Sequence, residues 1–200
     1  MRHFPPSLLA VLLMSILAAG FMLMWVSRTS NARAASARPM TDAVVQPPCG
    51  EAAFDTAFNT VNNGGGILTF NCGTATIFFS NQKVVTANVT IDGGGVMTLS
   101  GGNSTRLFLV AASQTLTLTN LTLTDGNSGA APGGGVMITD TGSLVADNVV
   151  FDHNTSNDQD GSAIFGQGNA AITLTNTLVQ NNTTNSFGAL YSSGPVRISG

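Results

Sequence analysis

The 200-residue chain is 43% hydrophobic but only 8% charged, and its formal net charge is −3. The few cations cannot form the basic patch that nucleic-acid binding requires. We therefore expect no nucleic-acid partner. Polarity is carried instead by Thr, Ser and Asn. Combined with Val, Leu, Ile and frequent glycines, this composition favours short strands joined by turns.

The N-terminal segment has the layout of a secretory signal. Residues 1–3 carry positive charge, an almost unbroken apolar run covers residues 8–26, and polar residues follow. Small residues at Ala32 and Ala34 form a candidate peptidase site, which predicts a signal peptide over residues 1–34 and a linker over residues 35–48. The alternative is a membrane anchor, because the apolar run approaches the ~20 residues that span a bilayer. Both alternatives predict a secreted or cell-surface protein that meets the membrane only through this segment.

Residues 50–62 are predicted to form a short amphipathic helix. Phe54, Ala57, Phe58 and Val61 follow the i, i+3, i+4, i+7 spacing of one helical face. The glycine run at residues 64–66 ends the helix. We therefore expect one helix with a single apolar face.

Beyond this helix the sequence repeats every 28 residues. The blocks 116–123, 144–151 and 172–179 align without gaps, and a second element recurs at 134–137, 162–165 and, two residues early, 188–191. A fixed period of this length predicts a solenoid. Because each period holds two or three strand-like pieces and no helix, we predict an all-β, right-handed parallel β-helix over residues 49–200, with about five coils of roughly 28 residues.

An asparagine stands at the centre of each aligned block: Asn120, Asn148 and Asn176. It separates two alternating apolar runs, and both runs can face inward only if the chain bends at the asparagine. Stacked one coil apart, the three amides are expected to form a hydrogen-bonded ladder at a buried corner. The alternative is a row of surface asparagines that binds sugar.

The chain has two cysteines, Cys49 and Cys72. In an exported protein an even number of cysteines predicts a disulfide. Two thiols without a nearby histidine cannot form a zinc site on their own.

Short motifs give the chain a family resemblance. Residues 133–136 followed by Phe151-Asp-His-Asn154, and 161–164 followed by 179–182, look like the GGAI and FxxN repeats of polymorphic outer membrane proteins, although only residues 151–154 fit FxxN fully. The segment from Cys49 to residue 95 resembles the start of pectin-lyase-like β-helix proteins of bacterial surfaces. This resemblance implies a surface location and assigns residues 50–62 to a cap over the first coil.

The last residues, 196–200, are predicted to form the first strand of another coil. Terminal repeats of a solenoid need a polar cap. No such cap follows this strand, so we expect the β-helix to be truncated at its C-terminus.

The resemblance to pectin-lyase-like β-helices implies polysaccharide lyase or hydrolase chemistry as one class of function. A lyase needs a cationic base, and the solenoid has only Lys83, Arg106 and Arg197, which lie in different coils. A hydrolase needs two carboxylates about 5 to 10 Å apart. Four carboxylates are candidates for such a pair: Asp147, Asp152, Asp158 and Asp160. Residues 156–161 could bind calcium but lack the glutamate that closes a calcium loop, so we expect no cofactor.

A non-catalytic binding role is the other class. Solenoids present long flat faces suited to binding. Because the cations are scattered, and because solvated aspartates are common in turns, we interpret the chain as an exported or cell-surface scaffold with an adhesin-like surface. Its expected partners are polysaccharides or components of host or cell surfaces, and a polysaccharide-degrading enzyme is the alternative.

Overall fold

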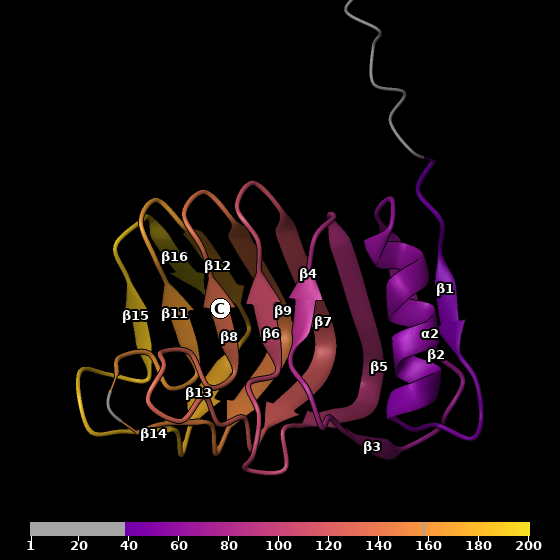
Figure 1. Ribbon diagram of the computed structural model, residues 1–200, viewed down its shortest axis with the longest axis horizontal. Helices are drawn as coiled ribbons and strands as arrows, with labels where there is room; N and C mark the ends of the chain where they lie inside the picture. Colours follow the sequence, from indigo (N-terminus) through magenta and orange to yellow (C-terminus); the bar gives the residue numbers. More distant parts are fainter. Residues whose placement is uncertain (1–38, 158) are drawn as a thin grey trace, which may run out of the picture. The chain divides into compact units, whose positions relative to one another are not determined.

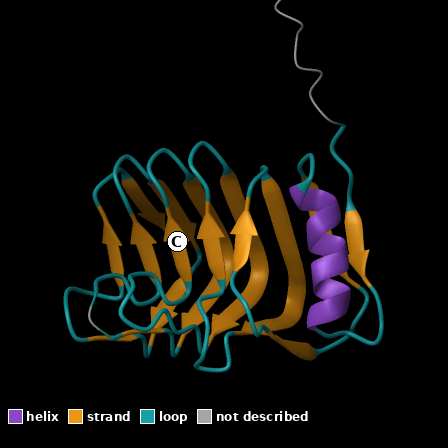
Figure 2. Ribbon diagram, in the orientation of Figure 1, coloured by secondary structure: helices purple, strands orange, loops and turns teal. Residues whose placement is uncertain are grey.

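The computed structural model describes residues 39–157 and 159–200. Within this part of the chain, parallel strands form a solenoid of about six turns, with one helix near its start (Figures 1 and 2). The predicted all-β solenoid is confirmed, with one turn more than expected. The first strand lies at Ala43–Val45, inside the expected linker. The expected signal peptide or anchor, residues 1–34, lies outside the described residues, and no helix among the described residues is long and apolar enough to cross a membrane.

Three parallel sheets form the walls of the solenoid. The nine-stranded sheet contains β1 (Ala43–Val45), β2 (Gly66–Phe70), β3 (Ala75–Phe78), β5 (Val89–Ser100), β7 (Thr115–Thr124), β9 (Ser143–Asp152), β12 (Ala171–Thr175), β13 (Leu178–Gln180) and β16 (Val196–Ser199). The five-stranded sheet, in front in Figure 1, contains β4 (Lys83–Val85), β6 (Phe108–Val110), β8 (Val136–Ile138), β11 (Ile164–Gly166) and β15 (Leu190–Ser192). The two-stranded sheet pairs β10 (Thr155–Ser156) with β14 (Thr183–Thr184).

The strand register follows the repeat in the sequence. Thr115 pairs with Ser143, and Ser143 with Ala171, so equivalent residues are 28 positions apart. In the five-stranded sheet, Ile164 pairs with Val136 on one side and with Leu190 on the other. The second pairing spans 26 residues, which confirms the two-residue contraction.

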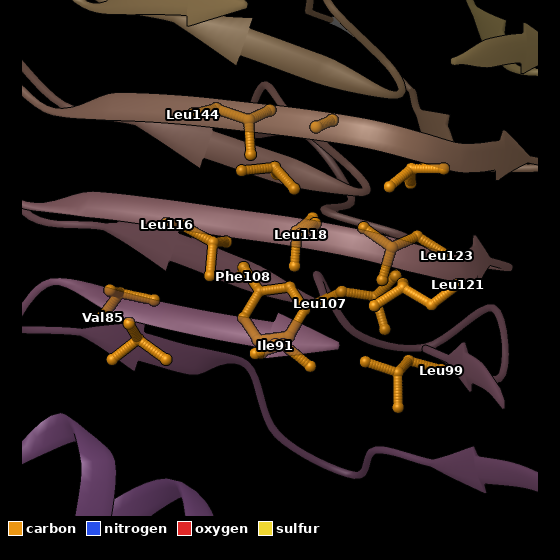
Figure 3. Close-up of a cluster of buried hydrophobic side chains, with 14 of the residues drawn as sticks. Val85, Ile91, Leu99, Leu107, Phe108, Leu116, Leu118, Leu121, Leu123 and Leu144 are labelled. Atoms are coloured by element: carbon orange, nitrogen blue, oxygen red, sulfur yellow. The ribbon is translucent and has the colours of Figure 1, made fainter. Parts of the chain in front are cut away.

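The apolar residues before each central asparagine face the core, and so do those that follow Asn120 and Asn148. Figure 3 shows Leu116 and Leu144, which pair across successive turns, pointing into the interior. Leu118 stacks in register on Ile91 in the same way. All four side chains are fully buried, so the inward direction of the repeat is confirmed.

The bend at the central asparagine comes from a left-handed backbone conformation. Asn120, Asn148 and Asn176 have φ values of 54°, 55° and 47°, a region that asparagine tolerates better than most residues. One such residue shifts by one position the alternation of side chains that point inward and outward. The flanking apolar runs on both sides can therefore face inward. The asparagine itself then points outward.

The expectation of a buried corner is wrong, because Asn148 and Asn176 are exposed and Asn120 is half-buried. On this outer corner, Asn148 donates to Oδ1 of Asn120 (2.8 Å), and Asn120 donates to Oδ1 of Asp92 (3.1 Å). Asn176 donates to Asp147 instead (3.4 Å). The amides therefore form a short exposed column.

A second column of asparagines comes from the last residues of the FxxN-like motifs, Asn154 and Asn182, whose burial was not predicted. Asn154 is fully buried and donates to the carbonyl of Leu123 (3.2 Å) and to Oδ1 of Asn182 (3.0 Å). Its own Oδ1 accepts the backbone N–H of Gly126 (2.9 Å). One turn earlier, Gly126 takes the equivalent position, because a side chain there would clash with the carbonyl oxygen of Gly134.

The helix α2 (Glu51–Asn62) covers the N-terminal end of the core. Its buried residues are Phe54, Ala57, Phe58 and Val61, as the spacing predicts. Phe54 and Phe58 pack on rings from the first turns, with centroids 4.7 Å apart for Phe54 and Phe79 and 6.4 Å for Phe58 and Phe108. The predicted disulfide between Cys49 and Cys72 is also present and joins the start of this helix to the end of β2, with Cα atoms 5.8 Å apart.

Differences in chain length are concentrated at one side of the solenoid. From the nine-stranded sheet into β6, β8 and β15 the chain takes residues 101–107, 125–135 and 181–189, and the last of these includes β14. On the other side, the turns 111–114, 139–142 and 167–170 all have the same length. The variable loops therefore lie together, at the bottom front of Figure 1.

Candidate binding surface

A row of apolar side chains runs along the outer face of the five-stranded sheet. Each strand of this sheet has three residues, and its middle residue points outward. In strand order these residues are Val84, Leu109, Met137, Phe165 and Tyr191, which pair in register from turn to turn. We call this row the apolar stripe. It crosses five turns, and none of its five positions is occupied by a charged residue.

The stripe is accessible along its length. Val84 and Tyr191 are 39% and 37% exposed, and the three residues between them are partly exposed. The rings of Phe165 and Tyr191 lie nearly parallel, with centroids 5.2 Å apart and planes 10° apart. Such a cross-strand pair orders both rings before any partner arrives. A contiguous exposed apolar surface is typical of an interaction site.

A polar cleft of about 460 Å³ is formed by segments that lead into three strands of the stripe. Its lining comes from the segments that immediately precede β4, β6 and β8, so it follows the same three turns. Amide, hydroxyl and guanidinium groups contribute to it, from Asn81, Gln82, Ser104, Arg106, Asn127 and Ser128. An apolar row next to convergent hydrogen-bonding groups is the usual composition of a ligand site.

Arg106 is the cation in this cleft. Its Nε donates to the carbonyl of Gly133 (2.8 Å), and its two Nη atoms donate to the carbonyl of Pro132 (2.7 Å) and to Oε1 of Gln82 (3.0 Å). These bonds fasten the longest variable loop, 125–135. Burial lowers the pKa of Arg106, and no ion pair is found for it among the residues that the structure describes.

The candidate catalytic carboxylates that the structure describes have different local partners. Asp147 lies exposed at the corner, whereas Asp152 lies at the end of β9, beyond the bend at Asn148. Asp160 accepts the backbone N–H of Phe187 (2.7 Å) and so has a role within its loop. Asp158 lies outside the described residues. Hydrogen bonds connect none of the three described aspartates to one another.

Asp152 has partners that favour its charged form. Nδ1 of His153 lies 2.9 Å from its carboxylate, and Asn181 donates to it at 2.8 Å. Partial burial acts to raise the pKa of Asp152, but these hydrogen bonds and the charge of His153 outweigh it and lower the pKa. An ionised carboxylate is a poor general acid. Within the described ranges, no group of three or more His, Cys, Asp or Glu side chains is arranged to hold a metal ion.

Lys83, one of the three cations considered for lyase chemistry, belongs to the cap. Its side chain points inward, is only 7% exposed, and lies 2.7 Å from Glu51 and 2.6 Å from Asp55 of α2. The ammonium also lies 4.7 Å from the centre of the Phe79 ring. This cluster was not predicted, because the strand pattern alone does not show that a lysine occupies a core position under the helix.

Acid should weaken this cap. Partial burial acts to raise the pKa of Glu51, but hydrogen bonds from Lys83 and Ser80 and the charge of Lys83 outweigh it and lower the pKa from 4.5 to about 2. A carboxyl whose pKa is lower in the folded chain stabilises it above the unfolded pKa, and this stabilisation is lost as the pH falls. We expect the melting temperature to fall between about pH 4.5 and pH 2.

The variant Glu51→Gln should show a smaller fall in melting temperature over this interval. The exposed Asp140→Asn variant is its control and should follow the unmodified chain. Part of the pH dependence should remain in Glu51→Gln, because the backbone N–H of Gly94 lowers the pKa of Asp92, although partial burial opposes it. Equal pH profiles for Glu51→Gln and the unmodified chain would contradict the assignment.

Comparisons of the chain with protein-family models, with curated proteins and with solved structures find no match. The class of protein is therefore defined by the fold itself: a parallel β-solenoid with a helical cap at its start.

Proposed function

We propose that this protein is an exported, non-catalytic scaffold that binds a polysaccharide or another cell-surface component along the apolar stripe. The main support for this proposal is the stripe itself, in which each of five turns places an accessible apolar side chain in the same register. The resemblance of its short motifs to bacterial surface β-helix proteins, and the secretory layout of residues 1–34, support an extracytoplasmic location.

The state of the charged side chains favours binding over catalysis. Lys83 is neutralised in the cap, Arg106 fastens a loop, and Asp152 is held in its ionised form. A hydrolase would need two carboxylates facing one another across a substrate, one of them protonated. No hydrogen bond joins Asp147, Asp152 and Asp160 to one another, and Asp152 is held in its ionised form, and both observations support the scaffold.

Binding should depend on the stripe and not on the solenoid as a whole. We expect Met137→Ser combined with Phe165→Ser to lower the affinity of the full chain for its polysaccharide by about tenfold or more, because both outward contacts are lost. Binding would be measured against a panel of immobilised cell-wall and host polysaccharides. The matched control is Val145→Ser, which removes an outward apolar residue from the nine-stranded sheet.

Two outcomes would contradict this proposal. The first is an equal loss of affinity in Val145→Ser and in the stripe variant, when circular dichroism shows both to be folded. The second is enzymatic: release of unsaturated products or of reducing ends from any panel member, abolished by Asp152→Asn, would establish the polysaccharide-degrading alternative.

A further inference from the structure

Arg106 carries a positive charge that no acidic side chain neutralises among the described residues. The partners of its guanidinium are two carbonyl oxygens and one amide oxygen. These neutral acceptors satisfy hydrogen bonds but leave the full charge. Burial lowers the pKa of the same group, so this cation is partly removed from water.

The guanidinium also keeps donors available. An arginine has five N–H groups, and three of these are used here, which leaves one on each Nη. The side chain lines the cleft together with Asn81 and Asn127. Each of these amides uses one N–H within the protein, on Ser80 Oγ (3.1 Å) and on the carbonyl of Asn103 (3.1 Å), and keeps the other. Guanidinium groups recognise the oxygens of carboxylates and sulfates through such donors.

Two carboxylates near this cleft have other partners: Asp125, two residues before Asn127, accepts the hydroxyl of Ser100 (3.2 Å), and the second is Glu51. Glu51 reaches the backbone N–H of Asn81 (3.4 Å) at one edge, but its carboxylate is already bound to Lys83. The cleft volume of about 460 Å³ is within the range of small-molecule sites.

We propose that this cleft binds an oxyanion, the carboxylate or sulfate group of an acidic sugar unit, with Arg106 supplying the charge and the side-chain amides supplying hydrogen bonds. This proposal names the chemistry of the ligand of the proposed function. It rests on that function, because the cleft must be part of the surface that contacts the polysaccharide. The apolar stripe then contacts the rest of the partner.

The test is a titration of the ¹⁵N-labelled full chain followed by NMR, with three probes: glucuronate, glucose 6-sulfate and glucose. We expect glucuronate or glucose 6-sulfate to shift the Arg106 Nε–H signal and the side-chain amide signals of Gln82 and Asn127. Glucose should leave them unchanged. A response to one acid only identifies the group as a carboxylate or as a sulfate.

Variants separate this site from general electrostatic attraction. Arg106→Gln should lower the affinity for the responding acid by about tenfold or more, whereas Arg106→Lys should retain part of it. The control is Arg197→Gln, which removes the exposed cation of β16 and should bind as the unmodified chain does. If Arg106→Gln does not fold, the titration of the unmodified chain still tests whether the cleft binds an acid, because it needs no variant.

The proposal is overturned if glucose produces the same shifts as the acids, if no cleft signal moves with either acid, or if Arg197→Gln loses as much affinity as Arg106→Gln. A result that contradicts polysaccharide binding by the apolar stripe is separate from a result that contradicts the cleft. The variant with Met137→Ser and Phe165→Ser should still bind the small acid, so loss of polysaccharide binding alone leaves the cleft assignment intact.

Discussion

Replacing Asn154 by aspartate is expected to destabilise the solenoid by about 3 to 5 kcal/mol at neutral pH. The change substitutes one oxygen for the NH₂ group that donates to the carbonyl of Leu123 and to Oδ1 of Asn182. The new oxygen would face two acceptors, and the added charge would be fully buried. Denaturant unfolding followed by circular dichroism measures this loss as a lower midpoint with an unchanged slope.

The matched control is Asn148→Asp, the same change in the same turn. Asn148 is exposed, and its amide makes one hydrogen bond, to Asn120. We expect a loss within about 1 kcal/mol. At low pH the Asn154→Asp deficit should shrink, because a protonated carboxyl carries a donor again. Equal effects of the two substitutions would show that the inner column does not differ in energy from the outer one.

Removing the disulfide is expected to cost about 3 kcal/mol. The bond between Cys49 and Cys72 closes a segment with a sequence separation of 23, and this segment contains the whole of α2. Without it the unfolded chain gains conformational freedom, and the cap is held only by packing and by the Lys83 ion pairs. The unfolding midpoint of the double variant Cys49→Ala/Cys72→Ala measures the effect.

Reducing agent provides the control for this prediction. It should lower the midpoint of the unmodified chain to that of the double variant and should leave the variant unchanged. An identical midpoint for the oxidised and reduced unmodified chain would show that the disulfide does not stabilise the cap.

The sequence predicted the parts of this fold that depend on local pattern. The spacing of Phe54, Ala57, Phe58 and Val61 determined the buried face of the helix, and the 28-residue period determined which strands pair. Both succeed because a helix and a parallel stack each impose one fixed periodicity on the chain.

The errors have a common physical origin. The bend at the corner asparagines was predicted, but their amides were expected to stack at a buried corner, whereas the left-handed backbone at each bend leaves the side chain on the outside. Asn154 was not recognised as buried because its partners come from the neighbouring turns and from a non-equivalent strand. Such contacts across turns have no signature in a single repeat.

The candidate site was harder to predict than the fold. Leu109, Met137 and Tyr191 differ in chemistry, and each is the middle residue of a strand only three residues long. An outward apolar residue in so short a strand cannot be distinguished from a core residue by its pattern. Arg106 stood out only as one of few cations, and its lack of an acidic partner became visible once the loop 125–135 was seen around it.

The uneven distribution of loop lengths has a consequence for how such a molecule diversifies. A single residue added within a strand would reverse the facing of every side chain beyond it, whereas the same residue added to loop 101–107 or 185–189 leaves the register untouched. These loops are next to the strands that carry the apolar stripe. Insertions and deletions can therefore reshape the recognition surface while the hydrophobic interior stays the same, which makes this corner the natural place to graft foreign peptides.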